Sequence, residues 1–424
     1  MNLLKRIGPW IVSAALCLLA TEIVGVLLYY RNANSLVYFN ARKANAAVVE
    51  PSMKRRLHPY FGYIGPYSYQ GSFYKTNNLG FTQIEPARDV PFVPEQDDFV
   101  VFVFGGSVAS RLVNPEHGGT SVRQALQRLP QLAGKKVVVY NMAQGPGKQP
   151  QQLMELAYLI AAGQHIDLVL SLDGALEFGA GLSNFEVGVD PIFPPASIML
   201  AIGNELTPID DSSQDYYELA YGVMHARAES RRYTLLLEES RSGIAYVKNR
   251  LMMAVYDRIL QSKLGAYDQT VVKATGESVR RLLGLDMPMT TSKQKVIEDI
   301  FNMWLRSSDL MKAMTNSVGA RYLNVVHPNA YHSKKSLTDA ERKILSLPEA
   351  EPMIRGGSAG YALIESHTDM LTSRGIVSAT TIFDDIPDTI YADKAGHFGK
   401  RGETMLAEFV AERVGMILRS PHDR

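Results

Sequence analysis

The sequence predicts an α/β fold in three layers, a parallel sheet flanked by helices on both faces, together with an N-terminal transmembrane helix. Short continuous apolar runs recur along the chain, and segments with the apolar spacing of helices separate them. Strands that are apolar throughout are typical of parallel sheets buried on both faces. The chain has 424 residues, of which 46% are hydrophobic and 21% charged, and this is the composition of a globular protein.

Charge and cysteine content narrow the class of protein. The 44 lysines and arginines nearly match the 43 aspartates and glutamates, so the formal net charge is +1. This balance argues against nucleic acid as a partner, because nucleic-acid binding requires a basic surface. Cys17 is the single cysteine, which excludes an intrachain disulfide. A domain of this size is stabilised by its core without disulfides, so the sequence still allows an exported protein.

The first element is an apolar segment over residues 7–30 that contains a single charged residue, Glu22. As a helix it is about 36 Å long, whereas the hydrocarbon core of a bilayer is about 30 Å thick. A cleaved signal peptide usually has a shorter apolar region. Leu16 precedes Cys17 where a lipid-attachment site has a small residue. We therefore expect an uncleaved signal anchor over residues 1–31.

Basic residues on both sides of this segment bear on its orientation. Lys5 and Arg6 precede it, which favours a cytoplasmic N-terminus. Arg31, Arg42 and Lys43 place positive charge beyond the other end as well. We expect residues 31–424 to lie outside the cytoplasm, so that the chain is a single-pass protein of the inner membrane with its main domain in the periplasm.

The rest of the chain divides into a juxtamembrane and lead-in segment over residues 32–97 and an α/β domain over residues 98–424. Apolar strands are expected over five ranges, 98–104, 135–141, 166–172, 320–328 and 376–379. Helices are expected from Thr120 to Leu129, from about 149 to 162, within 351–375, and from about 402 to 417. A helical insertion is expected over about 184–318, with helical periodicity at 197–206, 217–239 and 293–314.

Polar and glycine residues gather just past the ends of the predicted strands, where ligands bind in an open parallel sheet. "GGS" ends at Ser107 after the first strand, and Asn141 with a glycine-rich loop ends the second. The third strand ends in "DGALE" (173–177) and the fourth at His327. Asp393 and His397 come just before the last helix.

A serine, a histidine and an aspartate at these places point to nucleophilic catalysis. A serine hydroxyl needs an adjacent base, and the base needs a carboxylate that fixes its tautomer. Ser107, His397 and Asp393 fit these roles if the final loop folds back over the end of the first strand. The oxyanion needs preorganised donors, and the candidates are the backbone N–H groups of Ser107 and of Gly145 or Gly147.

Four blocks carry these residues, namely "FGGS" (104–107), "YNMAQGPGKQPQQL" (140–153), "SLDGALEF" (171–178) and "YADKAGHFGKRG" (391–402). In this order they resemble the SGNH/GDSL hydrolases, and "SLDGALEF" resembles the "DGxNE" form of the third block. "HPYFGY" (58–63) and "TNNLGF" (76–81) resemble the lead-in of membrane-anchored bacterial members. The resemblance covers roughly residues 58–180 and 320–416.

This resemblance implies a flavodoxin-like sheet with Ser107 as nucleophile, His397 as base and Asp393 as its carboxylate partner, without a cofactor. The candidates for the pocket around them are Asn141, Asp173, Gly174, Leu176 and His327. For His327, a packed core histidine is the alternative interpretation.

Two positions depart from the pattern of that family. Leu176 stands where the family has an asparagine donor, and Asn184 is a candidate to replace it. Asp393 and His397 lie one residue further apart than in the family's "DxxH" block. Other carboxylates that precede His397 are Asp384, Asp385 and Asp388. Either departure fits altered chemistry, or a protein that keeps the cleft and has lost turnover.

Two other kinds of site are disfavoured. The "GGS" turn lacks the GK[ST] of a P-loop and the GxGxxG of a dinucleotide fold, so phosphate binding is the weaker interpretation. His327 and His332 have no third ligand at a zinc spacing. We therefore expect no metal.

The function expected from these features is that of a membrane-anchored serine esterase or O-acyltransferase acting on an ester, an O-acylated carbohydrate. The alternative is a non-catalytic SGNH-like binding or scaffold protein that works with other proteins of envelope polysaccharide assembly. The sequence does not separate hydrolysis from acyl transfer, because both pass through the same acyl-serine intermediate.

Overall fold

The computed structural model describes residues 3–40, 55–68, 75–83, 89–196, 198–199, 214–283, 291–345 and 351–419. These residues fall into two compact units, within 53–207 and 275–424 for the larger and within 1–52 and 208–274 for the smaller. Residues 41–54 of the juxtamembrane segment, and most of the helix expected over 197–206, lie outside the described residues.

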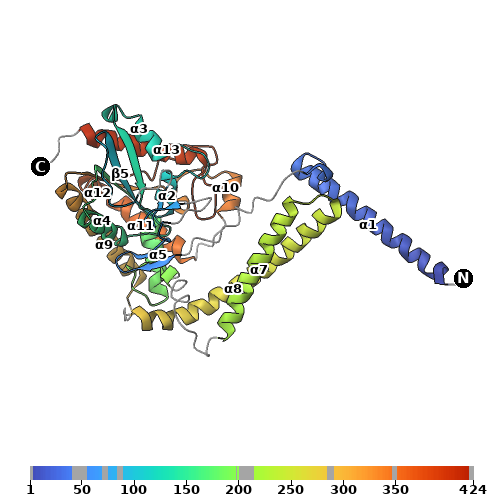
Figure 1. Ribbon diagram of the computed structural model, residues 1–424. Coiled ribbons are helices and arrows are strands. Elements are labelled where there is room, and N and C mark those ends of the chain that lie inside the picture. The colour runs from blue at the N-terminus through green and yellow to red at the C-terminus, as the bar shows by residue number, and fades with distance from the viewer. Residues whose placement is uncertain are drawn as a thin grey trace. The chain divides into compact units, whose positions relative to one another are not determined.

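The larger unit contains a five-stranded parallel sheet (Figure 1), which confirms the expected α/β class. Its strands are β5 (Asp98–Gly105), β6 (Lys136–Asn141), β7 (Leu168–Asp173), β8 (Arg321–Val326) and β9 (Ile376–Ser378). They lie in the order β6-β5-β7-β8-β9, with every pair parallel. Counted along the chain, this is the 2-1-3-4-5 order of doubly wound sheets, whose crevice opens between β5 and β7.

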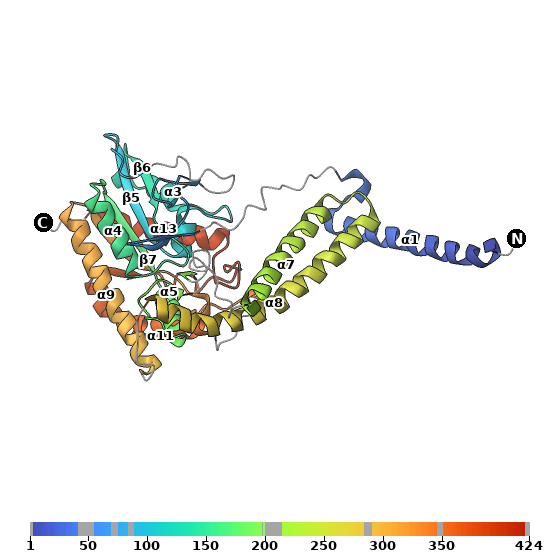
Figure 2. The ribbon, with the colours of Figure 1, turned by 60° about the horizontal axis from the view of Figure 1, so that its bottom comes forward.

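Helices cover both faces of this sheet (Figure 2). One face packs against α2 (Ser107–Val113), α3 (Val122–Gln127) and α13 (Lys400–Arg419). The other packs against α4 (Gln151–Ala161) and α9 (Lys293–Ser317). Val101 and Val103 of β5 belong to the first core and Val100 and Phe102 to the second, as the alternation of side chains along a strand requires.

A third core cluster joins α9 to α5 (Ala175–Glu186) and α11 (Pro352–Ser366), with Phe178, Trp304 and Tyr361 at its centre. Further short helices of this unit are η3 (Pro130–Leu132), η5 (Ala330–His332), α10 (Asp339–Ile344) and α12 (Thr368–Ser373).

Several expected boundaries are wrong in detail. The cap of α3 is Ser121 rather than Thr120, because Ser121 Oγ accepts the Gln124 N–H while the Gln124 side chain accepts the Ser121 N–H. The single helix expected within 351–375 is divided into α11 and α12, which meet at His367.

The expected insertion over about 184–318 also differs from the observed units. Helix α5 continues to Glu186, and α9 belongs to the core of the α/β unit, where Trp304 and Met311 are buried. The helical part that lies in the other unit is confined to 208–274.

The lead-in segment of the larger unit forms two small antiparallel hairpins. The first pairs β1 (Arg56–His58) with β2 (Gly62–Ile64), and the second pairs β3 (Lys75–Thr76) with β4 (Thr82–Gln83). Phe61, Ile64 and Phe81 from these hairpins are buried in the same core as α4. The lead-in is therefore part of the folded α/β unit.

The smaller unit contains α1 (Leu3–Ala33), η1 (Val37–Phe39), α7 (Gln214–Glu238) and most of α8 (Gly243–Leu283). Within α1, Val12–Ala33 is long and apolar enough to span a membrane. Figure 1 shows α7 and α8 side by side as a hairpin. Glu22 accepts hydrogen bonds from the N–H groups of Gly243 (2.8 Å) and Ile244 (2.7 Å), so this charged side chain caps the first turn of α8.

Candidate active site

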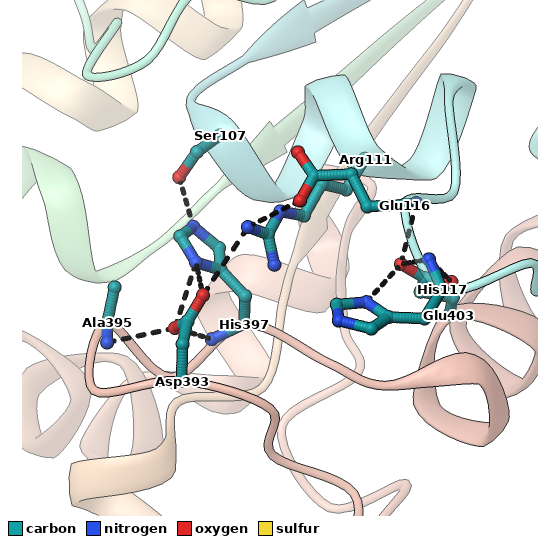
Figure 3. Close-up of polar contacts among 8 residues, drawn as sticks. All are labelled: Ser107, Arg111, Glu116, His117, Asp393, Ala395, His397 and Glu403. Atoms are coloured by element: carbon teal, nitrogen blue, oxygen red, sulfur yellow. Dashed lines mark hydrogen bonds and ion pairs between the residues drawn. The ribbon is translucent and has the colours of Figure 1, made fainter. Parts of the chain in front are cut away.

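The structure brings Ser107, His397 and Asp393 into one hydrogen-bonded chain (Figure 3). Ser107 Oγ lies 2.6 Å from His397 Nε2, and His397 Nδ1 lies 2.8 Å from Asp393 Oδ2. The serine comes from the end of β5, and the other two residues come from the loop before α13. The final loop thus folds back over the end of the first sheet strand, as the sequence predicts.

Two glycines position Ser107. Gly105 has a φ of +138°, and a Cβ atom there would lie 2.4 Å from the carbonyl oxygen of Leu172. A Cβ atom at Gly106 would lie 2.2 Å from the Leu176 side chain. Only glycine fits at Gly105, whereas a side chain at Gly106 would have to displace Leu176. The strand therefore turns sharply into α2 and presents the Ser107 side chain beyond the end of the sheet.

The extra residue between Asp393 and His397 is absorbed by a closed turn. Asp393 Oδ1 accepts the N–H groups of Ala395 (2.9 Å) and His397 (3.2 Å), and Gly396 has a φ of +76°. The His397 carbonyl accepts the Ala392 N–H at 2.7 Å, which closes the loop. The longer spacing therefore still places the carboxylate against the imidazole.

None of the alternative carboxylates contacts His397. Asp388 forms an ion pair with Arg401, and the described contacts of His397 with carboxylates are those with Asp393. Among these candidates, Asp393 is the residue placed to orient the histidine.

Gly145, rather than Gly147, lies beside Ser107. A Cβ atom at Gly145 would lie 3.3 Å from Ser107 Cβ and 3.8 Å from the Ser107 nitrogen. The Gly147 N–H is already bonded to the Gln144 carbonyl, whereas no described acceptor takes the Gly145 N–H. The Ser107 N–H is the first of α2 and has no partner within that helix. Neither of these two N–H groups has a partner among the described contacts, so both are candidates for an oxyanion site.

Leu176 packs against Gly106, the residue before Ser107, and its side chain offers no hydrogen-bond donor there. Asn184, the candidate replacement, is buried elsewhere. Its amide nitrogen contacts the carbonyls of Asp190, Phe193 and Pro194, and its oxygen accepts the Ala196 N–H at 2.9 Å. Asn184 therefore holds the loop after α5, and the suggestion that it completes the oxyanion site is wrong.

Three of the other pocket candidates have structural contacts. Asp173 is buried and accepts hydrogen bonds from Trp304 Nε1 and Asn324 Nδ2, both at 2.9 Å. Burial raises its pKa in spite of these bonds. Gly174 donates its N–H to Glu177 Oε2 at 2.8 Å and starts α5. Asn141 is buried, and its amide oxygen accepts the Ala143 N–H at 3.1 Å, which shapes the glycine-rich loop.

His327 is a core histidine. It is buried, its Nδ1 contacts the Pro328 carbonyl at 2.8 Å, and its own carbonyl accepts the Tyr361 hydroxyl at 2.6 Å. Burial lowers the pKa of His327 to about 4, so the ring is neutral at pH 7. His327 does not line the cavity that contains Ser107.

That cavity has a volume of about 210 Å³ and opens beside Ser107 and His397. Its lining includes three charged side chains that sequence reasoning missed, Arg55, Arg111 and Glu116. Arg111 lies one helical turn after Ser107, so its position was open to prediction from the helix period. Arg55 comes from the lead-in, and no local pattern connects it to the site.

Arg111 ties Asp393 to the neighbouring loop. Its Nη2 lies 2.8 Å from Glu116 Oε2 and 3.4 Å from Asp393 Oδ2. Burial alone would raise the pKa of Asp393, but the hydrogen bond to His397 and the charges of His397 and Arg111 outweigh it and lower the pKa. The carboxylate therefore stays ionised opposite the imidazole.

Glu403, in the first turn of α13, holds the loop that carries Glu116. Its carboxylate accepts the Glu116 N–H at 3.1 Å and contacts His117 Nδ1 at 3.2 Å (Figure 3). It also accepts the Gly119 N–H at 3.2 Å. The side chain of Glu403 is buried. These contacts link α13 to the rim of the cavity.

A buried ion pair fixes the backbone that leads to the Asp393 loop. Lys335 Nζ lies 2.8 Å from Glu341 Oε2, and both side chains are fully buried. Glu341 Oε1 also accepts the N–H groups of Ile390 (2.7 Å) and Tyr391 (3.1 Å). Burial alone would raise the pKa of Glu341, but the hydrogen bonds from Lys335 and these backbone groups lower it to about 2.

We expect Glu341→Gln to lower the free energy of unfolding by about 2–3 kcal/mol at pH 7, because hydrogen bonds to a charged group are lost in a buried place. The native pKa lies below the unfolded value of about 4.3, so this stabilisation is complete above that pH and is lost as the pH falls toward 2. Thermal unfolding between pH 7 and pH 2 measures this stabilisation. The difference in unfolding free energy between wild type and Glu341→Gln should decrease as the pH falls.

Glu408→Gln is the matched control, because Glu408 forms an exposed pair with Arg128 and its loss should cost less than about 1 kcal/mol. A difference in unfolding free energy between wild type and Glu341→Gln that stays constant across this pH range would contradict a stabilising, ionised Glu341.

Comparisons with known proteins add no family to this geometry: no family model matches the chain, and no curated protein matches it. Among the described residues, no group of three or more histidine, cysteine, aspartate or glutamate side chains is arranged to hold a metal ion. The interpretation of the site therefore depends on its own residues.

Proposed function

We propose that this protein is a membrane-anchored serine esterase or O-acyltransferase of the SGNH type. The observation that carries the proposal is the chain of hydrogen bonds from Ser107 through His397 to Asp393 at the edge of an open cavity. Its position at the crevice of a 2-1-3-4-5 sheet, and the order of the four sequence blocks, support the same assignment.

In the proposed reaction, Ser107 Oγ attacks the carbonyl carbon of an ester while His397 Nε2 takes the hydroxyl proton. The charge that develops on the carbonyl oxygen is stabilised by the N–H groups of Ser107 and Gly145. The ester C–O bond then breaks, and His397 returns the proton to the leaving alcohol. Asp393 holds the imidazole in the required tautomer and stabilises its positive charge.

The acyl group on Ser107 is then released by a second attack. Water gives hydrolysis, whereas a sugar hydroxyl gives acyl transfer, and His397 removes the proton from either one. We propose an O-acylated carbohydrate as the substrate, on the grounds that α1 is long and apolar enough to anchor the chain and that the domain is proposed to lie in the periplasm.

A non-catalytic role in envelope polysaccharide assembly is the second candidate, and Leu176 is the observation that favours it. The residue leaves the oxyanion site with backbone donors alone among the described contacts. In that case Ser107 would lie in a binding cleft without turnover.

Covalent labelling with a fluorophosphonate probe separates the two candidates. We expect the full chain in detergent to be labelled and Ser107→Ala to show no labelling, because the probe reacts with activated serines. Ser110→Ala is the matched control, since Ser110 lines the same cavity one turn further along α2. Absence of labelling in wild type, or equal labelling of Ser107→Ala, would contradict the enzymatic proposal.

A further inference from the structure

The cavity beside Ser107 has a wall that the proposed chemistry does not use. Gly65, Gly80 and Thr82 contribute backbone and small side chains to it from the lead-in hairpins, and Arg55 contributes a guanidinium group. The lead-in thus brings a positive charge to the cavity beside Ser107.

The other charged side chains that line the cavity form ion pairs with one another or with Asp393. Arg111 lies between Glu116 and Asp393, at 2.8 and 3.4 Å, and Asp393 also faces His397. In contrast, no carboxylate among the described residues forms an ion pair with Arg55. Within the described part of the chain, its charge is therefore the one in this lining without an ionic partner.

Arg55 is also held in place. Its Nη2 donates to the Gly145 carbonyl, and its guanidinium carbon lies 5.4 Å from the centre of the Tyr63 ring. An arginine carries five N–H donors in a planar fork that matches a carboxylate. One of these donors is bound to Gly145, and no described contact takes the others.

We propose that this cavity takes an ester whose alcohol part carries a carboxylate, as an O-acylated acidic sugar does, and that Arg55 binds this carboxylate. The inference depends on the proposed function and names its class of substrate. Because Arg55 also contacts the Gly145 carbonyl, binding the carboxylate would align the substrate with the oxyanion donors at the same time.

The test compares two aryl acetates of similar size, anionic 4-acetoxybenzoate and its neutral methyl ester, with the full chain in detergent. We expect Arg55→Met to lower kcat/KM for the anionic ester about 10–100-fold more than for the neutral ester, which is the range of a lost charge-assisted hydrogen bond. Comparing the same two esters in both proteins cancels their difference in intrinsic reactivity. High salt should reduce the preference of wild type.

Two variants serve as controls. Arg56→Met removes the same charge from the neighbouring residue, which is exposed and lies over the Tyr67 ring, and it should leave the ratio of the two rates unchanged. Arg55→Lys keeps the charge and should keep part of the preference. It also provides a variant with a smaller change if Arg55→Met does not fold.

The outcomes distinguish this inference from the proposal beneath it. If both esters require Ser107 and the Arg55 variants leave their ratio unchanged, the carboxylate subsite is wrong and the esterase proposal stands. If Ser107→Ala leaves the turnover of both esters unchanged, the proposed function fails, and the inference fails with it.

Discussion

Asp393→Asn is expected to lower kcat about 10⁴-fold on simple aryl acetates, the largest effect of any substitution outside Ser107 and His397. An amide at this position presents a donor or a neutral oxygen to His397 Nδ1, so the tautomer that accepts the Ser107 proton is no longer favoured. The imidazolium also loses its negative partner. Steady-state kinetics of the two proteins at the same pH measures the effect.

The geometry makes this substitution specific. Asparagine keeps an oxygen that can accept the N–H groups of Ala395 and His397, so the turn should survive and the melting temperature should change little. Asp388→Asn is the matched control, because Asp388 lies in the same stretch of chain and pairs with Arg401. We expect it to keep wild-type turnover. Near-normal turnover in Asp393→Asn, or a large loss in Asp388→Asn, would show that the wrong carboxylate has been assigned.

The parts of this site that the sequence predicts share a simple physical basis. The strands β5 and β6 contain continuous apolar runs, and β7 and β8 are mostly apolar. The polar residues that follow these strands gather at one edge because the strands are parallel. The sequence predicts that Ser107 and His397 meet, because Ser107 follows the apolar strand β5 and His397 precedes the amphipathic helix α13. Their contact still depends on a turn around Gly396 that no periodicity reveals.

The parts that could not be predicted depend on long-range packing. An amphipathic pattern shows that α9 has an apolar face but not which surface this face covers. The sequence therefore predicts that residues 293–317 belong to an insertion, whereas the helix packs in the core of the α/β unit. Asp173 and Asn184 look like site residues by position, yet both side chains are buried in hydrogen-bond networks. Arg55 precedes Ser107 by more than 50 residues and reaches the cavity only through the lead-in hairpins.

Leu176 sets the second large prediction, because it decides whether the oxyanion site is complete. The donors that the described structure places near the Ser107 side chain are the backbone N–H groups of Ser107 and Gly145. The Asn184 side chain is hydrogen-bonded to the backbone of the loop after α5. Removing one donor from such a site typically costs roughly 10²–10³ in rate. Wild type should therefore turn over aryl acetates slowly.

Leu176→Asn should restore most of that factor, an increase of roughly 10²-fold in kcat, since the side chain at 176 packs against Gly106, next to Ser107, and an amide there can donate to the oxyanion. Leu176→Asp is the matched control, because an aspartate side chain has nearly the same shape as an asparagine side chain but carries no donor when it is ionised. It also places a negative charge near the developing oxyanion, so the kcat of this variant should fall below that of wild type. An increase shared by both variants would mean that relief of packing, and not a donor, raised the rate. No change with either variant would mean that residue 176 does not reach the oxyanion, and that Ser107 and Gly145 supply the stabilisation by themselves.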